Sequence, residues 1–257
     1  MSASLVPPLP VHESRAILGM RVDALTYESA GEQILNWARA GESRSVCVAT
    51  VHMVMEGHDD PAFQQLVNGA DLVTSDGMPL VWGLRLLGCP QARRVYGPDL
   101  TLALCRAAAR AGIPVGFYGS TAPVLDALIA RLSARCPGLP VAYRHSPPFH
   151  LLSAEEAAAE IAAIRASGCR ILFVGLGCPK QERWIAAHRG QLDAVLIGVG
   201  AAFDFLAGNK RRAPDRVQAL GLEWLFRLAT EPRRLWRRYL IHNPRFLALF
   251  ARQVIAR

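Results

Sequence analysis

The sequence has no segment that resembles a membrane span or an export signal. Its longest apolar runs are interrupted by Arg, Asp or Gly within about ten residues, whereas a helix needs roughly 18 uninterrupted apolar residues to span a bilayer. The Pro-rich residues 1–16 show no charged start followed by an apolar run. We therefore expect a cytoplasmic protein that begins with a loose segment over residues 1–16.

The chain contains few cysteines, and their spacing matches no known motif. The six cysteines form no Cys-x-x-Cys pair and have no neighbouring His at the spacing of metal ligands. We expect buried free thiols, which fits a reducing compartment. The cysteines concerned are Cys47, Cys89, Cys105, Cys136, Cys169 and Cys178.

The common fingerprints of phosphate and metal binding are also missing. There is no Gly-x-x-x-x-Gly-Lys-Ser/Thr loop and no Gly-x-Gly-x-x-Gly after the first strand, which removes the signatures of P-loop and dinucleotide-binding proteins. The absence of an Asp-x-Asp pair removes the usual carboxylates for a divalent ion on donor phosphates. We expect no cofactor, no metal ligands and a metal-independent reaction.

Acidic residues are scarce in one part of the chain. Residues 209–257 contain 12 Lys and Arg against 3 Asp and Glu, while the first 208 residues contain 17 against 18. The net charge of +8 therefore comes from the C-terminal fifth. This distribution indicates an anionic partner for that segment: nucleic acid, anionic lipid or a phosphate-bearing substrate.

Short apolar runs alternate with longer amphipathic stretches, the pattern of an α/β protein. The pattern predicts a Rossmann-like, mainly parallel sheet flanked by helices, with a core over residues 17–210 and a basic amphipathic helical appendage over 211–257. In the appendage, helices should kink or restart at Pro232 and Pro244. Strands are expected at 45–51, 71–75, 113–119, 139–145, 170–177 and 193–200, and helices at 97–112, 121–136 and 153–168.

Several predicted strands end in glycine or in a carboxylate. Turns at 117–121, 174–182 and 197–214 would meet at one edge of a parallel sheet, where backbone amides and helix N-termini can hold a diphosphate. Asp76 directly follows a strand and precedes Gly77, a suitable position for a general base. Asp before Gly is also common in turns, so the pattern alone leaves a purely structural role open.

The order of these segments resembles the WecG/TagA/CpsF glycosyltransferases over residues 17–240. ADLVTSDGMPLVW (70–82) resembles the family's Ala-Asp-x-x-x-x-Asp-Gly block, RVYGPDL (94–100) its Arg-Val-x-Gly-x-Asp block, and GLGCPKQERW (175–184) its Gly-x-Pro-x-Gln-Glu block. GVGAAFDFLAGNKRRAP (198–214) and LGLEWLFRLATEPRRLWRRYL (220–240) complete the series. The resemblance implies an inverting glycosyltransferase.

The resemblance also implies roles for individual residues. Asp76 matches the proposed catalytic base, Arg94 supports the donor pocket, and the appendage arginines contact a diphosphate. On one continuous helix Arg227, Arg234 and Arg237 would fall within about 80° of one another around the helix axis. The predicted catalytic residues are Asp76, Arg94, Arg227, Arg234 and Arg237, and the predicted substrate-binding residues are Thr50, Gly77, Gly119, Gly175, Gly177, Pro179, Gln181 and Asp204.

One block departs from the family pattern. The family usually shows Thr-x-Asn after its early strand, where this chain has Val48-Ala49-Thr50. A hydroxyl replaces only part of the hydrogen bonding of an amide, so substrate recognition or activity is expected to differ. His52 follows in the same turn, and a lone His more often serves structure than catalysis.

The resemblance implies transfer of a hexose or N-acetylhexosamine, of the N-acetylmannosamine or glucose type, from a UDP-sugar to an undecaprenyl-diphosphate-linked saccharide. Bacterial exopolysaccharide, capsule and teichoic acid assembly use such steps. Arg mixed with aromatic residues over 233–257 favours an anionic membrane surface as partner over nucleic acid or a merely solvated helix. The alternative is a catalytically weakened UDP-sugar-binding or scaffold protein of the same fold. The apolar appendage also allows a homo-oligomer.

Overall fold

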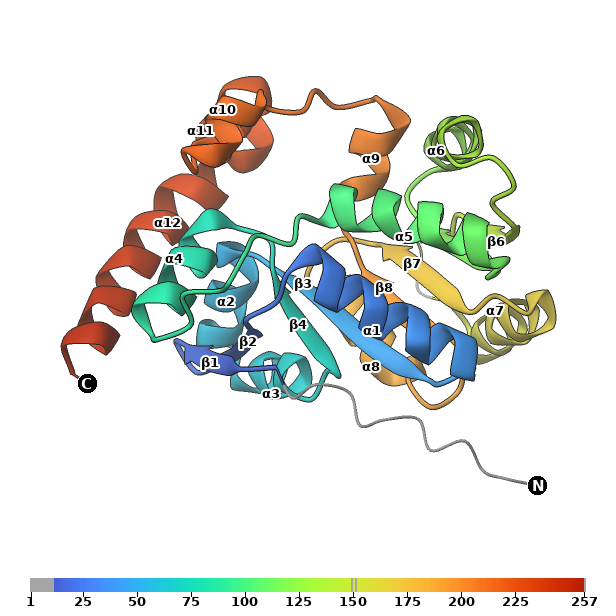
Figure 1. Cartoon of the computed structure of the whole chain (residues 1–257), viewed down its shortest axis with the longest axis horizontal. Coiled ribbons are helices and arrows are strands. Elements are labelled where there is room, and N and C mark those ends of the chain that lie inside the picture. Colours follow the sequence, from blue (N-terminus) through green and yellow to red (C-terminus); the bar gives the residue numbers. More distant parts are fainter. Residues whose placement is uncertain (1–11, 149, 151, 257) are drawn as a thin grey trace.

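A six-stranded parallel sheet forms the centre of the computed structural model, which describes residues 12–148, 150 and 152–256 (Figure 1). The strand order is β4-β3-β8-β7-β5-β6, and every pairing within this sheet is parallel. The predicted α/β fold with a mainly parallel sheet is therefore confirmed. The strands are β3 (Arg44–Ala49), β4 (Leu72–Ser75), β5 (Val115–Gly119), β6 (Val141–His145), β7 (Ile171–Gly175) and β8 (Val195–Gly198).

Helices cover both faces of the sheet, which explains why the inner strands are almost continuously apolar. The helices predicted at 97–112, 121–136 and 153–168 are α5, α6 and α7. The helices are α1 (Tyr27–Ala40), α2 (Val51–Asp59), α3 (Pro61–Asn68), α4 (Met78–Leu86), α5 (Gly97–Ala111), α6 (Ala122–Arg135), α7 (Ala154–Ser167), α8 (Lys180–His188), α9 (Ala202–Ala207), α10 (Asp215–Ala219), α11 (Glu223–Thr230) and α12 (Pro232–Ile255).

Local sequence sets many of the helix ends. Ser153 and Glu156 form a capping box at the start of α7, and Gly168 ends that helix in a left-handed conformation with φ of 69°. Thr26 caps α1 in the same way, and Gly112 ends α5. These residues orient the helices against the sheet before any tertiary contact is considered.

A small antiparallel hairpin, β1 (Ser14–Ile17) and β2 (Met20–Asp23), lies beside the sheet. The carboxylate of Asp23 accepts a hydrogen bond from the backbone N–H of Val73 at 2.7 Å, which joins the hairpin to β4. Of the segment expected to be loose, residues 1–11 lie outside the described residues, and its last three residues enter β1.

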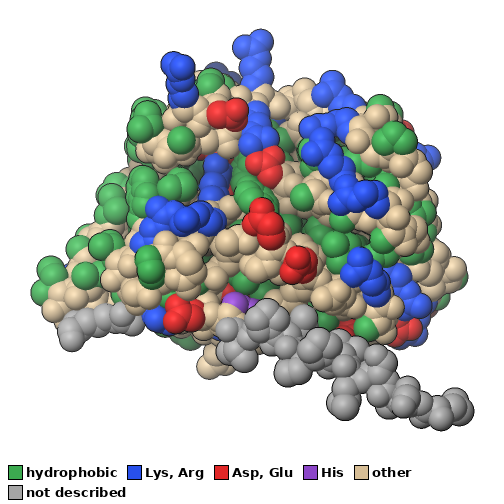
Figure 2. All heavy atoms as spheres, viewed as in Figure 1, with side chains coloured by type: hydrophobic (Ala, Val, Ile, Leu, Met, Phe, Trp, Pro, Cys, Tyr) green, Lys and Arg blue, Asp and Glu red, His purple; other side chains and the backbone are tan. Residues whose placement is uncertain are grey.

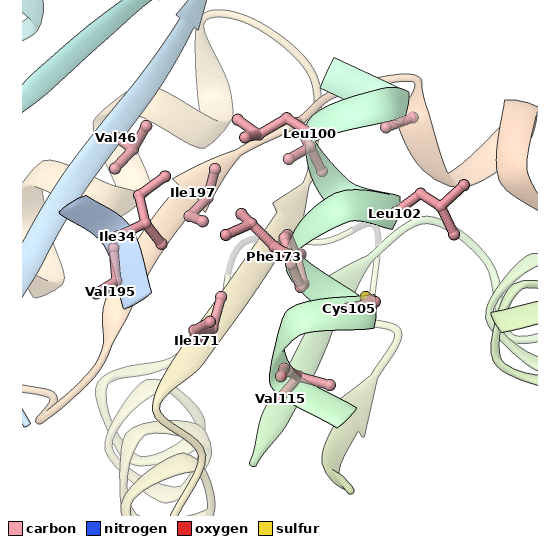
Figure 3. Packing of buried hydrophobic residues seen from close by; sticks show 14 of the residues in the cluster. Ile34, Val46, Leu100, Leu102, Cys105, Val115, Ile171, Phe173, Val195 and Ile197 are labelled. Atoms are coloured by element: carbon pink, nitrogen blue, oxygen red, sulfur yellow. The ribbon is translucent and has the colours of Figure 1, made fainter. Parts of the chain in front are cut away.

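The hydrophobic core lies on both faces of the sheet. On one face α1 and α5 pack over the central strands, and Figure 3 shows Ile34 of α1 beside Val46 and Val195 of the sheet.

All six cysteines are free, and five of them are buried, as predicted. Burial raises the pKa of the Cys47 thiol, so this side chain behaves as a small apolar residue.

The appendage packs on the core through its last helix (Figure 1). Phe246 and Phe250 of α12 are buried in the same cluster as residues of α2 and α4, with their rings stacked at 5.7 Å. The predicted restart at Pro232 is confirmed, because α12 begins there. The chain remains helical through Pro244, so no restart occurs at this second proline.

Two features of α12 explain this difference. Pro244 lies on the exposed face, so only one backbone hydrogen bond is lost, and the buried phenylalanines anchor the helix beyond it.

No helix within the described ranges is both long and apolar enough to cross a membrane.

Candidate active site

The carboxyl ends of β3 and β4 open into a pocket that the appendage covers. The first residues after these strands, Thr50 and Asp76, form its floor, and α10, α11 and α12 form its other walls. The pocket opens to solvent, and the empty space between its walls and at its mouth amounts to about 630 Å³. Its lining is Thr50, Val51, His52, Asp76, Gly77, Met78, Pro79, Arg94, Gln218, Gly221, Glu223, Trp224, Arg227, Arg238, Tyr239 and Asn243.

Asp76 is held by backbone and side-chain contacts at the end of β4. Its N–H donates to the carbonyl of Ala49 at 2.9 Å, and its carboxylate accepts from the Arg94 guanidinium at 3.2 Å and the Gly97 N–H at 3.4 Å. Its side chain is 17% exposed. Burial raises the pKa of the Asp76 carboxyl above its usual value although Arg94 opposes this shift, which makes Asp76 a stronger base than an exposed aspartate.

Arg94 connects this carboxylate to the appendage. Its guanidinium donates to the Glu223 carboxylate of α11 at 2.6 Å and to the Gln218 side-chain carbonyl of α10 at 3.1 Å. It also donates to the backbone carbonyl of Asp76 and lies 4.1 Å from the centre of the Tyr96 ring. A single side chain therefore couples the position of the candidate base to closure of α10 and α11.

Two appendage arginines line the pocket, Arg227 from α11 and Arg238 from α12. The Nε atom of each is buried and has no hydrogen-bond partner among the residues that the structure describes. Arg238 donates one long bond, 3.4 Å, to the hydroxyl of Thr50. Unsatisfied guanidinium groups at a pocket wall are well suited to bind an anion with several oxygens, such as a diphosphate.

Arg234 and Arg237, predicted to act with Arg227, do not line this pocket. Arg234 forms an exposed ion pair with Glu231 at 2.6 Å, and the guanidinium of Arg237 lies 5.2 Å from the centre of the Trp236 ring. The prediction that these arginines share one helical face is wrong, because α11 ends at Thr230 and α12 starts at Pro232 with a new orientation.

Gln181, predicted to bind substrate, is buried between two strand ends. Its side-chain carbonyl accepts from the N–H groups of Gly177 at 3.2 Å and Gly200 at 3.0 Å, and its amide donates to Glu182 at 2.7 Å. Gln181 thus fixes the loops after β7 and β8. It can influence a ligand through these loops, and its role in binding stays a prediction.

Gly119 and Gly175 lie side by side at the ends of β5 and β7. A Cβ atom on Gly119, whose φ is 118°, would lie 2.6 Å from the carbonyl oxygen of Gly175, so no larger residue fits without a shift. Pro179 precedes α8 in the following turn. These residues shape the edge of the sheet, and they do not line the Asp76 pocket.

Asp204 of α9 lies next to a second, basic pocket. Its carboxylate pairs with Lys210 at 3.2 Å, and Lys210 also faces Glu231 at 3.5 Å. Arg227 lies in the walls of both pockets and so connects them. The second pocket is lined by Phe205, Asn209, Lys210, Arg211, Arg227, Thr230 and Glu231.

Comparisons with known proteins identify the family. The profile of the glycosyl transferase WecG/TagA/CpsF family matches residues 15–257. A protein of Bacillus spizizenii (strain ATCC 23059 / NRRL B-14472 / W23), N-acetylglucosaminyldiphosphoundecaprenol N-acetyl-beta-D-mannosaminyltransferase, is 33% identical over 196 residues. The match covers 76% of this chain and 74% of that protein.

This chain belongs to the WecG/TagA/CpsF family. It is a glycosyltransferase. The family resemblance expected from the sequence blocks is therefore confirmed. The comparisons do not test the roles of single residues. The roles of Asp76, Arg94 and Arg227 remain predictions that the pocket geometry supports, and those of Arg234 and Arg237 remain predictions without that support.

The polar residues of the pocket wall that the sequence reasoning on this glycosyltransferase missed include Arg238, Glu223 and Gln218. Glu223 had a usable signal, since it is one of only three acidic residues in the basic segment 209–257. Arg238 had none, because the turn of α12 that faces the pocket is set by the break at Pro232 rather than by the sequence RRLWRRYL. Gln218 lies in a five-residue helix, which is too short to leave a recognisable pattern in the sequence.

The departure from the family's Thr-x-Asn pattern lies at the pocket. The Thr50 hydroxyl caps α2 by accepting from the Met53 N–H at 3.4 Å and also accepts from Arg238. Val48 is buried in the core cluster, and a Cβ on Gly97 would lie 3.6 Å from both Val48 and the Asp76 carboxylate. Val48 and the Asp76 carboxylate therefore both border the space beside Gly97.

Proposed function

We propose that this glycosyltransferase moves a hexose or N-acetylhexosamine, of the N-acetylmannosamine or glucose type, from a UDP-sugar to an undecaprenyl-diphosphate-linked saccharide. The observation that carries the proposal is that one pocket holds the partly buried Asp76 carboxylate together with Arg227 and Arg238, two guanidinium groups that form no ion pair among the described residues. The name of the Bacillus relative, an N-acetylmannosaminyltransferase acting on a diphosphoundecaprenol-linked sugar, supports the substrate class.

The proposed reaction is a single inverting displacement. Asp76 accepts the proton of an acceptor hydroxyl as the hydroxyl oxygen forms a bond to the anomeric carbon of the donor. The bond from that carbon to the diphosphate oxygen breaks, and its electron pair leaves with UDP. Arg94 keeps the Asp76 carboxylate in place through its contacts with the backbone and side chain of the same residue.

The departing diphosphate gains negative charge in the transition state. In this proposal Arg227 and Arg238 neutralise that charge, a role suited to the planar guanidinium group, which can bond two phosphate oxygens at once. Since the sequence has no Asp-x-Asp pair, the reaction is proposed to need no divalent ion on the diphosphate. Lys210 and Arg211 of the second pocket would extend the same basic surface.

A lipid-linked acceptor requires contact with a membrane surface, and the appendage supplies apolar side chains for it. Hydrophobic side chains gather over the left flank in Figure 2, where Figure 1 shows α12 and α4. We propose a peripheral location on the inner face of the cytoplasmic membrane. The exposed large hydrophobic residues are Trp82, Leu86, Leu220, Leu222, Leu225, Trp236, Leu240, Ile241, Leu247 and Ile255.

Calorimetric titration of the full chain with UDP and a panel of UDP-sugars tests the donor assignment. The titrations are made in the presence of a chelator and again with magnesium. The proposal expects saturable binding without metal, tighter for one UDP-sugar than for UDP. Absence of binding to every nucleotide sugar would overturn it.

A catalytically weakened UDP-sugar-binding protein of the same fold is the second candidate, favoured by Val48 and Thr50 where the family usually has Thr and Asn. Both candidates bind UDP-sugar. Turnover with an undecaprenyl-diphosphate-linked saccharide separates them, because only the enzyme releases UDP in step with product.

A further inference from the structure

Three potential metal ligands meet where α2 packs against α12. His52 and Glu56 lie one helical turn apart on α2, and His242 approaches them from α12. One ligand atom from each of these residues lies within 4.8 Å of the others. The His52 and Glu56 side chains are 17% and 34% exposed, so the cluster is partly shielded from water.

The hydrogen bonding of the two histidines points independently to a missing ligand. The Nδ1 atoms of His52 and His242 are buried and have no hydrogen-bond partner within the described part of the chain. The Nδ1 atom of His52 is 3.5 Å from the Glu56 carboxylate, too long for a good hydrogen bond. The two rings meet edge-on with centroids 5.6 Å apart, so they bring both imidazoles to the same place between the helices.

We propose that His52, Glu56 and His242 bind a transition-metal ion of the Zn²⁺ type. Two imidazole nitrogens and one carboxylate are a known ligand set for Zn²⁺, and they disfavour Mg²⁺, which prefers oxygen ligands. Bonds of about 2.0–2.2 Å in a tetrahedral site bring ligand atoms to roughly 3.3 Å from one another. Side-chain rotation closes the remaining gap from 4.8 Å.

The local charges permit this ion but do not strongly favour it. Arg238 lies near His52 and opposes a cation, and Glu56 supplies the only carboxylate of the cluster. The nearest charged pair on the same two helices, Asp59 with Arg245, is already neutral, with both bonds at 2.6 Å. An anion bound by Arg238 would reduce the repulsion, so metal and diphosphate binding should favour each other.

An ion at this position would join the core to the helix that closes the active site. The helix α2 starts at Thr50 on the pocket floor, and α12 carries Arg238 one turn before His242. The bound ion would thus hold α12 in the position in which Arg238 faces the pocket. This is a structural role, distinct from a metal on the donor diphosphate.

Titration of the full chain with ZnCl₂, followed by calorimetry and by thermal unfolding, tests the proposal. We expect one Zn²⁺ per chain, a higher melting temperature with Zn²⁺, and no comparable binding of Mg²⁺. His242→Gln, which keeps a similar shape, should weaken Zn²⁺ binding at least tenfold. His58→Ala is the matched control, because His58 is exposed on α2 and should leave the affinity within twofold.

Two results would overturn the proposal: no saturable Zn²⁺ binding by the native chain, or equal affinity in His242→Gln and the native chain. If His242→Gln has lost its helical circular dichroism, His52→Gln and Glu56→Gln replace it, with the same tenfold expectation for each. UDP titration of the native chain in chelator tests the proposed function without Zn²⁺, so its failure would be seen separately from a failure of Zn²⁺ binding.

Discussion

At the scale of single residues, the protonation of Asp76 determines how activity should depend on pH. Burial raises the pKa of this carboxyl, and the apolar Val48 borders the same space beside Gly97 as the carboxyl does. A base must be deprotonated to act, so activity should be lost as pH falls through this raised pKa, which lies above the ordinary aspartate value of about 3.9.

The variant Val48→Thr tests this origin of the pKa shift. A hydroxyl beside the carboxylate can donate a hydrogen bond to the charged form, which lowers the pKa. The acidic limb of the kcat/KM profile should therefore move to lower pH, while the fold is preserved because Val and Thr have similar shapes. A limb that stays in place or moves to higher pH would contradict this account of position 48.

Arg237 and Arg238 are neighbours in sequence with different environments. Arg238 faces the pocket with a buried Nε atom, while Arg237 is exposed beside Trp236. We expect Arg238→Gln to weaken UDP binding at least tenfold, since a charge-assisted bond to phosphate is worth about 1.5–3 kcal/mol. Arg237→Gln should change it by less than twofold. Equal effects of the two substitutions in a UDP titration would contradict the assignment.

At the scale of secondary-structure elements, Glu223 connects α11 to the core through Arg94 at 2.6 Å. Glu223→Gln removes the charge of this contact, so α11 should open more often and Arg94 should hold Asp76 less firmly. We expect kcat/KM to fall about tenfold, and limited proteolysis within residues 220–231 to become faster. Asp215→Asn on α10 is the control, because Asp215 is exposed and forms no ion pair among the described residues.

If proteolysis of Glu223→Gln proceeds at the native rate, the ion pair does not control closure of α11. A fall in activity without faster proteolysis would instead place the effect on Asp76 alone. The two readouts together separate positioning of the base from movement of the helix.

The elements that periodicity controls could be predicted from the sequence. The six strands of the sheet lie within two or three residues of the predicted ranges, because apolar runs between amphipathic helices leave little choice in a parallel sheet. The β1–β2 hairpin was not predicted, since four-residue strands leave almost no pattern. The position of Asp76 was predicted because it directly follows a strand.

The closing wall of the pocket could not be predicted in the same way. The family resemblance grouped Arg227 with Arg234 and Arg237, and extrapolating one helix across Pro232 supported that group. The chain instead turns at Glu231 and brings Arg238 to the pocket. The contact between His52 and His242 joins residues 190 positions apart. Such placements depend on tertiary packing, which local sequence does not encode.

At the scale of the whole molecule, the basic and apolar surfaces lie on the same appendage. Exposed leucines of α11 and α12, together with the exposed Trp236, accompany its arginines, as in helices that lie at a membrane surface. A near-neutral core with a basic, apolar flank predicts binding to anionic vesicles that weakens as salt increases.

The same flank could join two copies in solution, which light scattering with and without vesicles would detect as a change of size.

The pair Leu240→Asp and Leu247→Asp, made together, tests this surface. Both side chains are exposed on α12, at 55% and 62%, so the fold should tolerate the change. We expect at least tenfold weaker sedimentation with vesicles containing phosphatidylglycerol, because the aspartates are repelled by lipid phosphates. Ala163→Asp with Ala166→Asp adds the same charge on α7, far from α12 in Figure 1, and should retain most binding. Equal losses would show that net charge alone controls binding.

The central claim is that Asp76 accepts the proton in sugar transfer, and the turnover of Asp76→Asn tests it most directly. The account predicts a rate reduced about 10²- to 10⁴-fold, with UDP binding nearly unchanged. The melting temperature should not fall, since the substitution removes a charge whose burial is unfavourable and leaves Arg94 paired with Glu223. Full turnover by a folded Asp76→Asn protein would contradict the account.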